Sequence, residues 1–383
     1  MLTRAVAAIS AAILSLTLAG SGHAEFDPEF EHGPLRFDLG GRFMFDFLLD
    51  SSAPADDQDD FLVRRARLKL KVDHGEHWNF TGSVDFPDGD GRVRDFSMSY
   101  TGWPVHLEVG RMQEPFGMAE SESSKYLVLM ERPLASGLAA GYSLGVRANV
   151  RGERWSLNVG AFSPVTERLD LADREDDDAL DARFNWTPLR RDWAFIHLGV
   201  GMSWRRPDDN RLRFSLRPET RLVDDLNINH STLRDVPRYR LTGLEFAWRA
   251  ESLLLQSEYF RVDIRRGNQP DAVFDGYYAQ LSWAVTGERR GYSTRRGVFG
   301  GLGPGHGLFD GGPGAVELAL RYGQADVRDA GVRGDTGDVL TTGINWYPVD
   351  NLRGSVNYVR ITENEFDRRY REDLWQARLQ FHF

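Results

Sequence analysis

The sequence has no cysteine, only three lysines, and no long apolar run after its first twenty residues. The lack of cysteine excludes disulfides, thiolate metal sites and cysteine nucleophiles. No later segment approaches the ~20 apolar residues that a membrane-spanning helix needs. If the mature chain lies in a membrane, it must therefore be a β-barrel, because every backbone polar group needs a partner there.

Arginine largely replaces lysine in this chain. The 47 basic residues include only Lys69, Lys71 and Lys125 as lysines, so 44 are arginines. Arginine stays charged and offers a planar fork of donors that suits oxyanions, although nucleotide bias in a genome would give the same composition. The 57 acidic residues make the net charge −10, which argues against a non-specific nucleic-acid binder.

The first 24 residues have the pattern of a secretory signal peptide. Arg4 precedes a small and apolar run over residues 5–20, and Gly22-His23-Ala24 supplies a small-x-small cleavage site. A membrane anchor fits less well, because the run is short and contains serine, threonine and glycine. We expect removal of residues 1–24 and one barrel domain over residues 25–383.

The last strand carries the pattern that decides the fold class. From Trp375 to Phe383 every second residue is apolar and the residues between are polar, so one strand face is apolar and the other polar. An apolar outside and a polar inside are typical of outer-membrane barrels. The sequence therefore predicts an all-β, 16-stranded antiparallel transmembrane barrel in the outer membrane of a Gram-negative bacterium. Its strands are expected at residues 37–47, 63–72, 78–86, 95–100, 105–109, 143–150, 155–162, 180–186, 196–204, 241–249, 253–262, 276–285, 316–322, 340–346, 352–359 and 375–383.

Short connections alternate with longer, mostly acidic ones along the chain. This alternation matches periplasmic turns and external loops, and it places both termini in the periplasm. The segment 287–313 is an exception, because it is long and glycine-rich where a short turn is expected. The sequence offers no account of its length.

The inward parity of the second expected strand holds four cations, Arg65, Arg67, Lys69 and Lys71, with Arg64 breaking the alternation. Rows of arginine and lysine filter anions. A different explanation is charge balance against inward carboxylates. These are Asp38, Asp46, Asp85, Asp95 and Glu108.

The connection from Met112 to Tyr142 is too apolar for a freely solvated loop. Loops of this length usually carry function. We expect it to fold into the lumen and narrow it. Its polar residues Ser123, Ser124, Lys125 and Arg132 would then line the constriction, where hydroxyls and cations together suit a tetrahedral oxyanion.

Several short motifs, in their order and spacing, resemble the phosphate-selective porin O and P family. They cover essentially the whole mature chain, and no single one is strong. The motifs are Leu39-Gly40-Gly41-Arg42, Val63-Arg64-Arg65-Ala66, Gly110-Arg111, Glu114-Pro115-Phe116-Gly117, Ser123-Ser124-Lys125-Tyr126, Glu131-Arg132, Gly276-Tyr277-Tyr278-Ala279-Gln280-Leu281, Thr286-Gly287-Glu288-Arg289, Gly343-Ile344-Asn345-Trp346-Tyr347 and Asn357-Tyr358.

The resemblance implies a trimeric outer-membrane channel that passes phosphate-like anions. It implies constriction arginines at Arg42, Arg64, Arg65 and Arg132, a constriction aspartate at Asp95, and loop hydroxyls at Ser123 and Ser124. An arginine ladder from the outer mouth would fall among Arg211, Arg213, Arg217 and Arg221, whose spacing shares one face of an extended strand. The expected partners are small anions, outer-membrane lipid and lipopolysaccharide, and further copies in a homotrimer, with no cofactor and no metal.

The chain departs from the family at one point. The best-known members carry a lysine shortly before the Ser-Ser-Lys segment, where this chain has Glu120, Ser121 and Glu122. Carboxylates at a narrow point of low dielectric should weaken anion binding. A porin for polyphosphate, an organic anion or a cation is therefore a competing hypothesis.

Three histidine or acidic patterns bear on catalysis and metal binding. Asn229-His230-Ser231 has the residue types of a hydrolase dyad, but side chains adjacent on an extended segment point apart, so we expect no enzyme. His74 and His77 could bind a metal, but a solvated turn is the simpler interpretation. The acidic runs at residues 56–60 and 173–178 could bridge lipopolysaccharide through divalent cations, or be solvated loop charge.

Overall fold

The computed structural model describes residues 29–53, 58–87, 91–163, 177–223, 226–329, 331–365 and 368–383. The expected signal peptide, and residues 56, 57 and 173–176 of the acidic runs, lie outside this part. Sixteen strands form one closed antiparallel barrel, as predicted, in which each strand pairs with its neighbours in the chain and β23 closes onto β2. Within the described part, no helix is long and apolar enough to cross a membrane.

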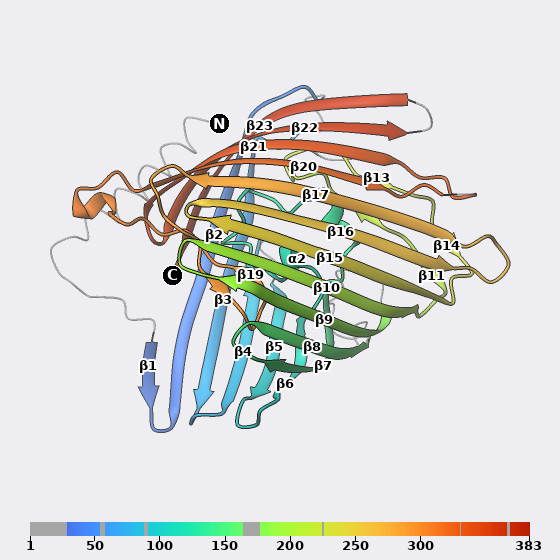
Figure 1. Ribbon diagram of the computed structural model, residues 1–383. Helices are drawn as coiled ribbons and strands as arrows, with labels where there is room; N and C mark the ends of the chain where they lie inside the picture. Colours follow the sequence, from blue (N-terminus) through green and yellow to red (C-terminus); the bar gives the residue numbers. More distant parts are fainter. Residues whose placement is uncertain are drawn as a thin grey trace.

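The barrel strands are longer than predicted in most cases. Figure 1 shows β2 to β6 on one side and β10 to β23 sweeping around the other, with α2 enclosed between them. The strands are β2 (Leu35–Ser51), β3 (Phe61–His74), β4 (Trp78–Asp85), β5 (Arg92–Tyr100), β6 (His106–Gln113), β7 (Tyr142–Arg151), β8 (Trp155–Ser163), β9 (Asp177–Arg190), β10 (Ala194–Pro207), β15 (Arg238–Ala250), β16 (Leu253–Arg265), β17 (Ala272–Ala284), β20 (Ala315–Asp326), β21 (Thr336–Val349), β22 (Leu352–Glu365) and β23 (Arg368–His382).

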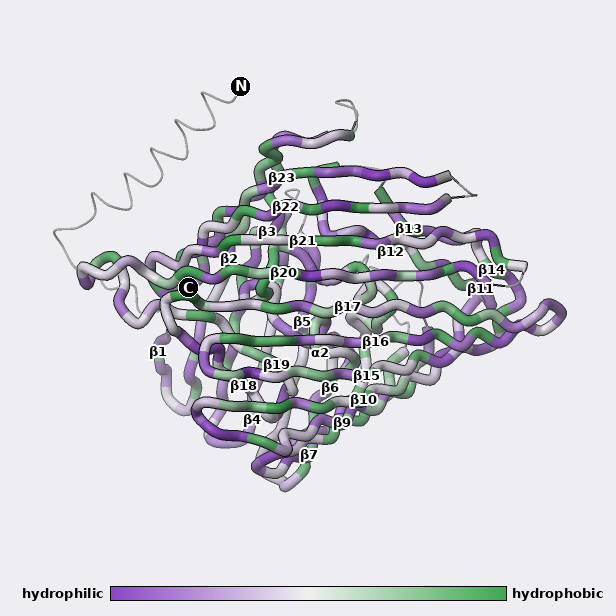
Figure 2. The backbone as a smooth tube through the Cα atoms, turned by 45° about the horizontal axis from the view of Figure 1, so that its top comes forward, coloured by the Kyte–Doolittle hydropathy of each residue, from purple (hydrophilic) through white to green (hydrophobic). Residues whose placement is uncertain are grey.

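The strand parity separates an apolar outside from a polar inside. On β10 the outward residues Leu198, Met202 and Trp204 are exposed, whereas the inward residues His197 and Ser203 are buried in the lumen. Side chains alternate because successive residues of a strand point to opposite faces. Figure 2 shows hydrophobic and hydrophilic residues alternating along the barrel strands, and it shows that β22 and β23 become largely hydrophilic toward their connecting loop.

The first described strand and the C-terminal residue lie at the end of the barrel that carries the short turns. The short strand β1 (Glu29–His32) pairs with the first residues of β2, from Leu35 to Asp38. Beyond it, Phe383 exchanges backbone hydrogen bonds with Gly41 of β2. The opposite end, called the loop end below, carries the long connections.

The core of the molecule lies inside the barrel and is built from two loops that fold inward. The loop from Glu114 to Gly141 contains α2 (Met118–Ser121) and the 3-10 helix η2 (Leu134–Leu138), and its apolar side chains are buried. Its Phe116 packs on Gly201 and Gly243 of the wall, where a Cβ would come within 3.2 Å of the ring. The inward fold predicted for this loop is therefore present.

The second inward loop connects β10 to β15. It contains two nested antiparallel pairings of two residues each. The outer one pairs β11 (Arg211–Leu212) with β14 (Leu233–Arg234), and the inner one pairs β12 (Ser215–Leu216) with β13 (Ile228–Asn229). Their apolar side chains join the same buried cluster as η2. Apolar burial thus fixes both loops inside the lumen.

The long segment between β17 and β20 also enters the barrel, from the turn end. It contains the hairpin of β18 (Tyr292–Ser293) and β19 (Val298–Phe299), followed by the 3-10 helix η3 (Leu308–Asp310). Phe299 packs with Met118 of the first loop and Phe195 of the wall. The segment between β17 and β20, where a short turn was expected, therefore packs against the loop from Glu114 to Gly141 on its turn-end side. That loop is called the constriction loop below.

Candidate functional site

The lumen holds a cavity of about 1560 Å³ lined mainly by polar residues. Arg42 of β2 reaches from the wall to the constriction loop, where its Nη1 lies 3.0 Å from Ser123 Oγ and 2.7 Å from Ser124 Oγ. Among the described residues, no carboxylate forms an ion pair with Arg42. Its charge is thus held beside two hydroxyls that can still donate their own protons.

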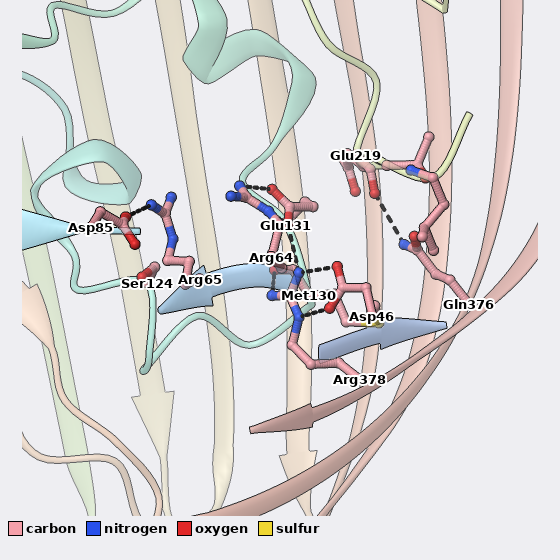
Figure 3. Close-up of polar contacts among 12 residues, drawn as sticks. Asp46, Arg64, Arg65, Asp85, Ser124, Met130, Glu131, Glu219, Gln376 and Arg378 are labelled. Atoms are coloured by element: carbon pink, nitrogen blue, oxygen red, sulfur yellow. Dashed lines mark hydrogen bonds and ion pairs between the residues drawn. The ribbon is translucent and has the colours of Figure 1, made fainter. Parts of the chain in front are cut away.

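Arg64 and Arg65 both line the cavity although they are consecutive in one strand. The reason is a β-bulge, because Met44 pairs with Arg65 and Phe45 with Val63, which leaves Arg64 as the extra residue. Both arginines are ion-paired. Arg64 donates two hydrogen bonds to Glu131, of 2.6 and 2.7 Å, and Arg65 donates one of 2.8 Å to Asp85 (Figure 3).

Glu131 lies where the constriction loop meets the wall. It also accepts from Arg378 of β23, whose guanidinium forms a bidentate pair with Asp46 of β2 (Figure 3). Burial alone would raise the pKa of Glu131, but the charges of Arg64 and Arg378 lower it well below its ordinary value. The loop is therefore held by a carboxylate that stays ionised.

Side chains of the wall and of the segment between β17 and β20 also bind the backbone of the constriction loop. Arg353 donates to the carbonyls of Leu127 and Val128, and Arg290 donates to that of Tyr126 at 2.6 Å. Gln380 donates to the carbonyl of Lys125 at 3.0 Å. These donors satisfy carbonyls that would otherwise be buried in the lumen without partners.

The other residues predicted for the constriction, Arg132, Asp95 and Lys125, each contact a different kind of partner. Arg132 donates to the carbonyls of Ala119 and Glu122, so it fastens α2. Asp95 is bound by the hydroxyl of Ser83. Lys125 lies over the ring of Tyr126, with Nζ 5.0 Å from the ring centroid. Burial, together with the charges of Arg42 and Lys71, lowers the pKa of the Lys125 ammonium to about 8.

Three of the four ladder arginines line the cavity. These are Arg213, Arg217 and Arg221, whereas Arg211 lies outside the lining and pairs with Asp209 at 3.5 Å. The stretch is not one long strand, because it consists of two-residue ladders and ends at Glu219, which has a φ of +53°. Arg221 follows that turn.

The two carboxylates that replace the expected lysine both line the cavity. Glu120 lies 3.4 Å from Arg132, and its side chain is one-fifth exposed. Glu122 is buried, and its Oε1 has no hydrogen-bond partner among the described residues. Burial raises the pKa of Glu122 to about 8.

The lumen cations thus fall into two groups. The paired arginines each form an ion pair with a carboxylate; they include Arg64, Arg65, Arg67, Arg132, Arg147, Arg183, Arg205, Arg290, Arg321 and Arg378. The unpaired cations have no such partner among the described residues. They include Arg42, Lys69, Arg213, Arg217 and Arg221, which line the cavity, and Lys125 of the constriction loop.

Sequence reasoning missed two arginines of the long segment between β17 and β20. Arg290 pairs with Glu317 of β20 at 2.8 Å, and Arg296 lines the cavity and donates to the carbonyl of Ser121 at 2.6 Å. The signal that could have found them is the unusual length of this segment at the turn end.

The residues considered for catalysis and metal binding have other roles. His230 is buried, its Nε2 accepts from the Phe214 amide at 2.9 Å, and its Nδ1 lies 2.7 Å from the carbonyl of Ser231. Both ring nitrogens are therefore engaged by the backbone. His77 lies in an exposed turn against Tyr100. Among the described residues, no three His, Asp or Glu side chains gather in an arrangement that could hold a metal.

The chain is similar to known porins in both sequence and fold. The sequence profile described as "Phosphate-selective porin O and P" matches residues 37–383. The chain belongs to this porin family. Porin O of Pseudomonas aeruginosa is 28% identical over 406 residues, which cover 93% of this chain and 89% of that protein. An uncharacterised protein of Caulobacter vibrioides is 27% identical and covers the same share of this chain and 76% of its own length.

Solved porin structures share the fold at low sequence identity. An anion-selective porin from Comamonas acidovorans superimposes with a TM-score of 0.58 at 11% identity, over 91% of this chain and all of that one. OmpF of Salmonella typhi gives a TM-score of 0.57, also at 11% identity, over 93% of this chain and all of that one. As a member of the porin family, the protein is an outer-membrane channel and not an enzyme, with the loop end outside the cell.

Proposed function

We propose that this porin passes small oxyanions of the phosphate type through a constriction formed by Arg42, Ser123 and Ser124. The contact of one unpaired guanidinium with two loop hydroxyls carries the proposal. Guanidinium N–H groups and hydroxyls are donors that match tetrahedral oxyanions. Arg132 contributes by fixing the loop that carries the two serines.

The unpaired cations provide binding positions for an anion on both sides of the constriction at Arg42. Arg213, Arg217 and Arg221 line the cavity toward the loop end, and Lys69 lines it toward the turn end. Cations spaced along a lumen let an anion exchange one partner for the next. Arg64 contributes little net charge, because Glu131 and Asp46 together balance Arg64 and Arg378. Asp85 pairs with both Arg65 and Arg67, so it offsets only part of the charge of Arg65.

The second candidate is a porin with weak anion preference or a different solute. Glu120 favours it, because its carboxylate lines the same cavity as Arg42, and Glu122 adds a second negative charge only above its raised pKa of about 8. Ionised carboxylates there repel anions and attract cations.

One measurement separates the two candidates. The zero-current potential of the purified protein in a planar bilayer under a salt gradient gives its ion preference, and titration with phosphate then tests for block of chloride current. Anion preference with phosphate block supports the first candidate. Cation or weak preference without block contradicts it and favours the second.

We also propose that the protein is a homotrimer surrounded by lipopolysaccharide. A structure titled as the trimer form of OmpT of Vibrio cholerae has the same fold, with a TM-score of 0.53 at 10% identity, over 92% of this chain and all of that one. Mass measurement of the purified protein in detergent tests the trimer, and a monomeric mass would contradict it.

A further inference from the structure

The lipid-facing wall carries a row of arginines near the loop end of β10, β15 and β16. Arg238 of β15 is paired in register with Arg265 of β16. The register that pairs Arg205 with Tyr239 brings Arg206 of β10 level with Arg238. Neighbouring strands lie about 4.8 Å apart, so three guanidinium groups from three strands converge within the span of one phosphorylated sugar.

These arginines point outward and lie just beyond the apolar band. On β10, Arg206 follows the exposed Trp204 by two residues and so shares its face. On β16, outward Tyr259 is followed at the same parity by Arg261 and Arg265. Aromatic residues mark the membrane interface in such barrels. The arginine row is therefore at the level where the head groups of the outer leaflet begin.

The row has a larger excess of positive charge than the layer below it. In that layer Asp263 accepts from Arg240 and from Arg261, at 2.9 and 3.0 Å. At the row itself, Asp271 contacts Arg265, whereas Arg206 and Arg238 form no ion pair with a described residue.

Arg266 adds a fourth guanidinium beside this row. Its Nε is buried and has no hydrogen-bond partner among the described residues. Like charges directly opposite one another on a sheet are destabilising. The arrangement is thus unfavourable until an anion binds to it.

An open pocket of about 620 Å³ lies among these side chains. Its lining consists of Arg206, Asn210, Pro237, Arg238, Arg265, Arg266 and Asp271. None of these residues lines the lumen cavity. An anion bound here would be outside the conduction path and next to the membrane.

We propose that this pocket binds the phosphorylated head group of a lipid of the outer leaflet, the chemistry that lipid A presents. Guanidinium forks bind phosphate oxygens in pairs, and the apolar band below the row accommodates the acyl chains of the same molecule. The occupant is a lipid and not free phosphate, because the pocket opens beside the lipid-facing wall. The inference does not depend on the ion preference of the channel.

The test compares lipid retention by two double variants of the full-length protein purified in detergent. Arg206→Ala with Arg238→Ala removes the row, and Arg154→Ala with Arg191→Ala removes two exposed arginines at the turn end as a matched control. Each protein is titrated with lipid A and with dephosphorylated lipid A, and bound lipid is counted by native mass spectrometry. Heat modifiability on gels verifies that each barrel is folded.

We expect the row variant to lose about tenfold or more in affinity for lipid A, because each charge-assisted hydrogen bond contributes more than 1.4 kcal/mol. The control should bind lipid A as the parent does, and dephosphorylated lipid A should bind weakly to all three proteins. An unchanged affinity of the row variant overturns the proposal, as does an equal loss in the control. Displacement of lipid A by inorganic phosphate at millimolar concentration would overturn the assignment to a lipid.

Discussion

Arg42 and Arg378 lie in neighbouring strands of the same barrel and have opposite surroundings. The guanidinium of Arg378 is bound by Asp46 and Glu131, and its charge is cancelled inside the wall. The guanidinium of Arg42 contacts two hydroxyls and keeps its charge. Arg378 thus helps to hold the constriction loop against the wall, whereas Arg42 is available to an anion.

Removing a paired arginine should have the largest effect, and it should be on stability. Arg378→Met leaves Asp46 buried without its partner, so we expect the free energy of unfolding to fall by about 3–5 kcal/mol. Arg371→Met on the same strand removes an exposed partner of Asp373 and should cost less than about 1 kcal/mol. Urea unfolding of the barrel in lipid vesicles, followed by tryptophan fluorescence, measures both. Equal losses in the two variants would show that Arg378 is not structural.

The next largest effect should be on ion preference. Arg42→Ala removes a charge that no described carboxylate offsets, so we expect the ratio of chloride to potassium permeability to fall by about tenfold. Arg65→Ala should lower this ratio less, because Asp85, which also pairs with Arg67, offsets part of the charge of Arg65. Zero-current potentials under a salt gradient give both ratios. A larger effect for Arg65 than for Arg42 would contradict the division into paired and unpaired cations.

Strand alternation was sufficient to predict the barrel and its inward loop. Period-two patterns need only local sequence; they were clear in nine of the expected strands, and every expected strand overlaps one of the sixteen strands of the closed sheet. The apolar residues between Met112 and Tyr142 were likewise enough to predict a loop that is buried in the lumen.

The partners of the arginines could not be predicted in the same way. Arg378 and Glu131 are 247 residues apart in the chain, and they meet only because the loop crosses the lumen. The bulge at Arg64 depends on the register between β2 and β3, which neither strand specifies alone. The segment between β17 and β20 is held by the ion pair of Arg290 with Glu317, two residues that are 27 positions apart in the chain. Side-chain pairing across a closed sheet is a property of the tertiary structure.

Raising the pH should reduce the contribution of the unpaired cations. The pKa of Lys125 is lowered to about 8 by burial and by Arg42 and Lys71, so the ammonium loses its charge as the pH rises through 8. The pKa of Glu122 is raised to about 8 by burial, so this carboxyl gains a negative charge in the same range. Both changes make the lumen less positive, and chloride preference should fall between pH 7 and about 9.

Two variants separate these contributions to the pH dependence. Lys125→Met should start from a lower chloride preference at pH 7 and keep only the part of the fall that Glu122 causes. Glu122→Gln should keep only the part that Lys125 causes, and the double variant should be nearly flat. Chloride is the permeant ion, since phosphate itself titrates in this range. A full pH response in the double variant would contradict the assignment to Lys125 and Glu122.

The smallest effect should come from the outer arginines, and it should depend on salt. Arg217 lines the cavity, whereas Arg211 lies outside it beside Asp209. The Debye length is about 30 Å at 0.01 M salt and about 3 Å at 1 M. Arg217→Ala should therefore lower single-channel chloride conductance by roughly twofold at the low concentration and hardly at all at the high one, because its charge acts on ions approaching from the mouth. Arg211→Ala should leave both conductances unchanged. Equal conductances for the two variants would contradict this prediction. Lining the cavity would then not decide which of these arginines attracts anions.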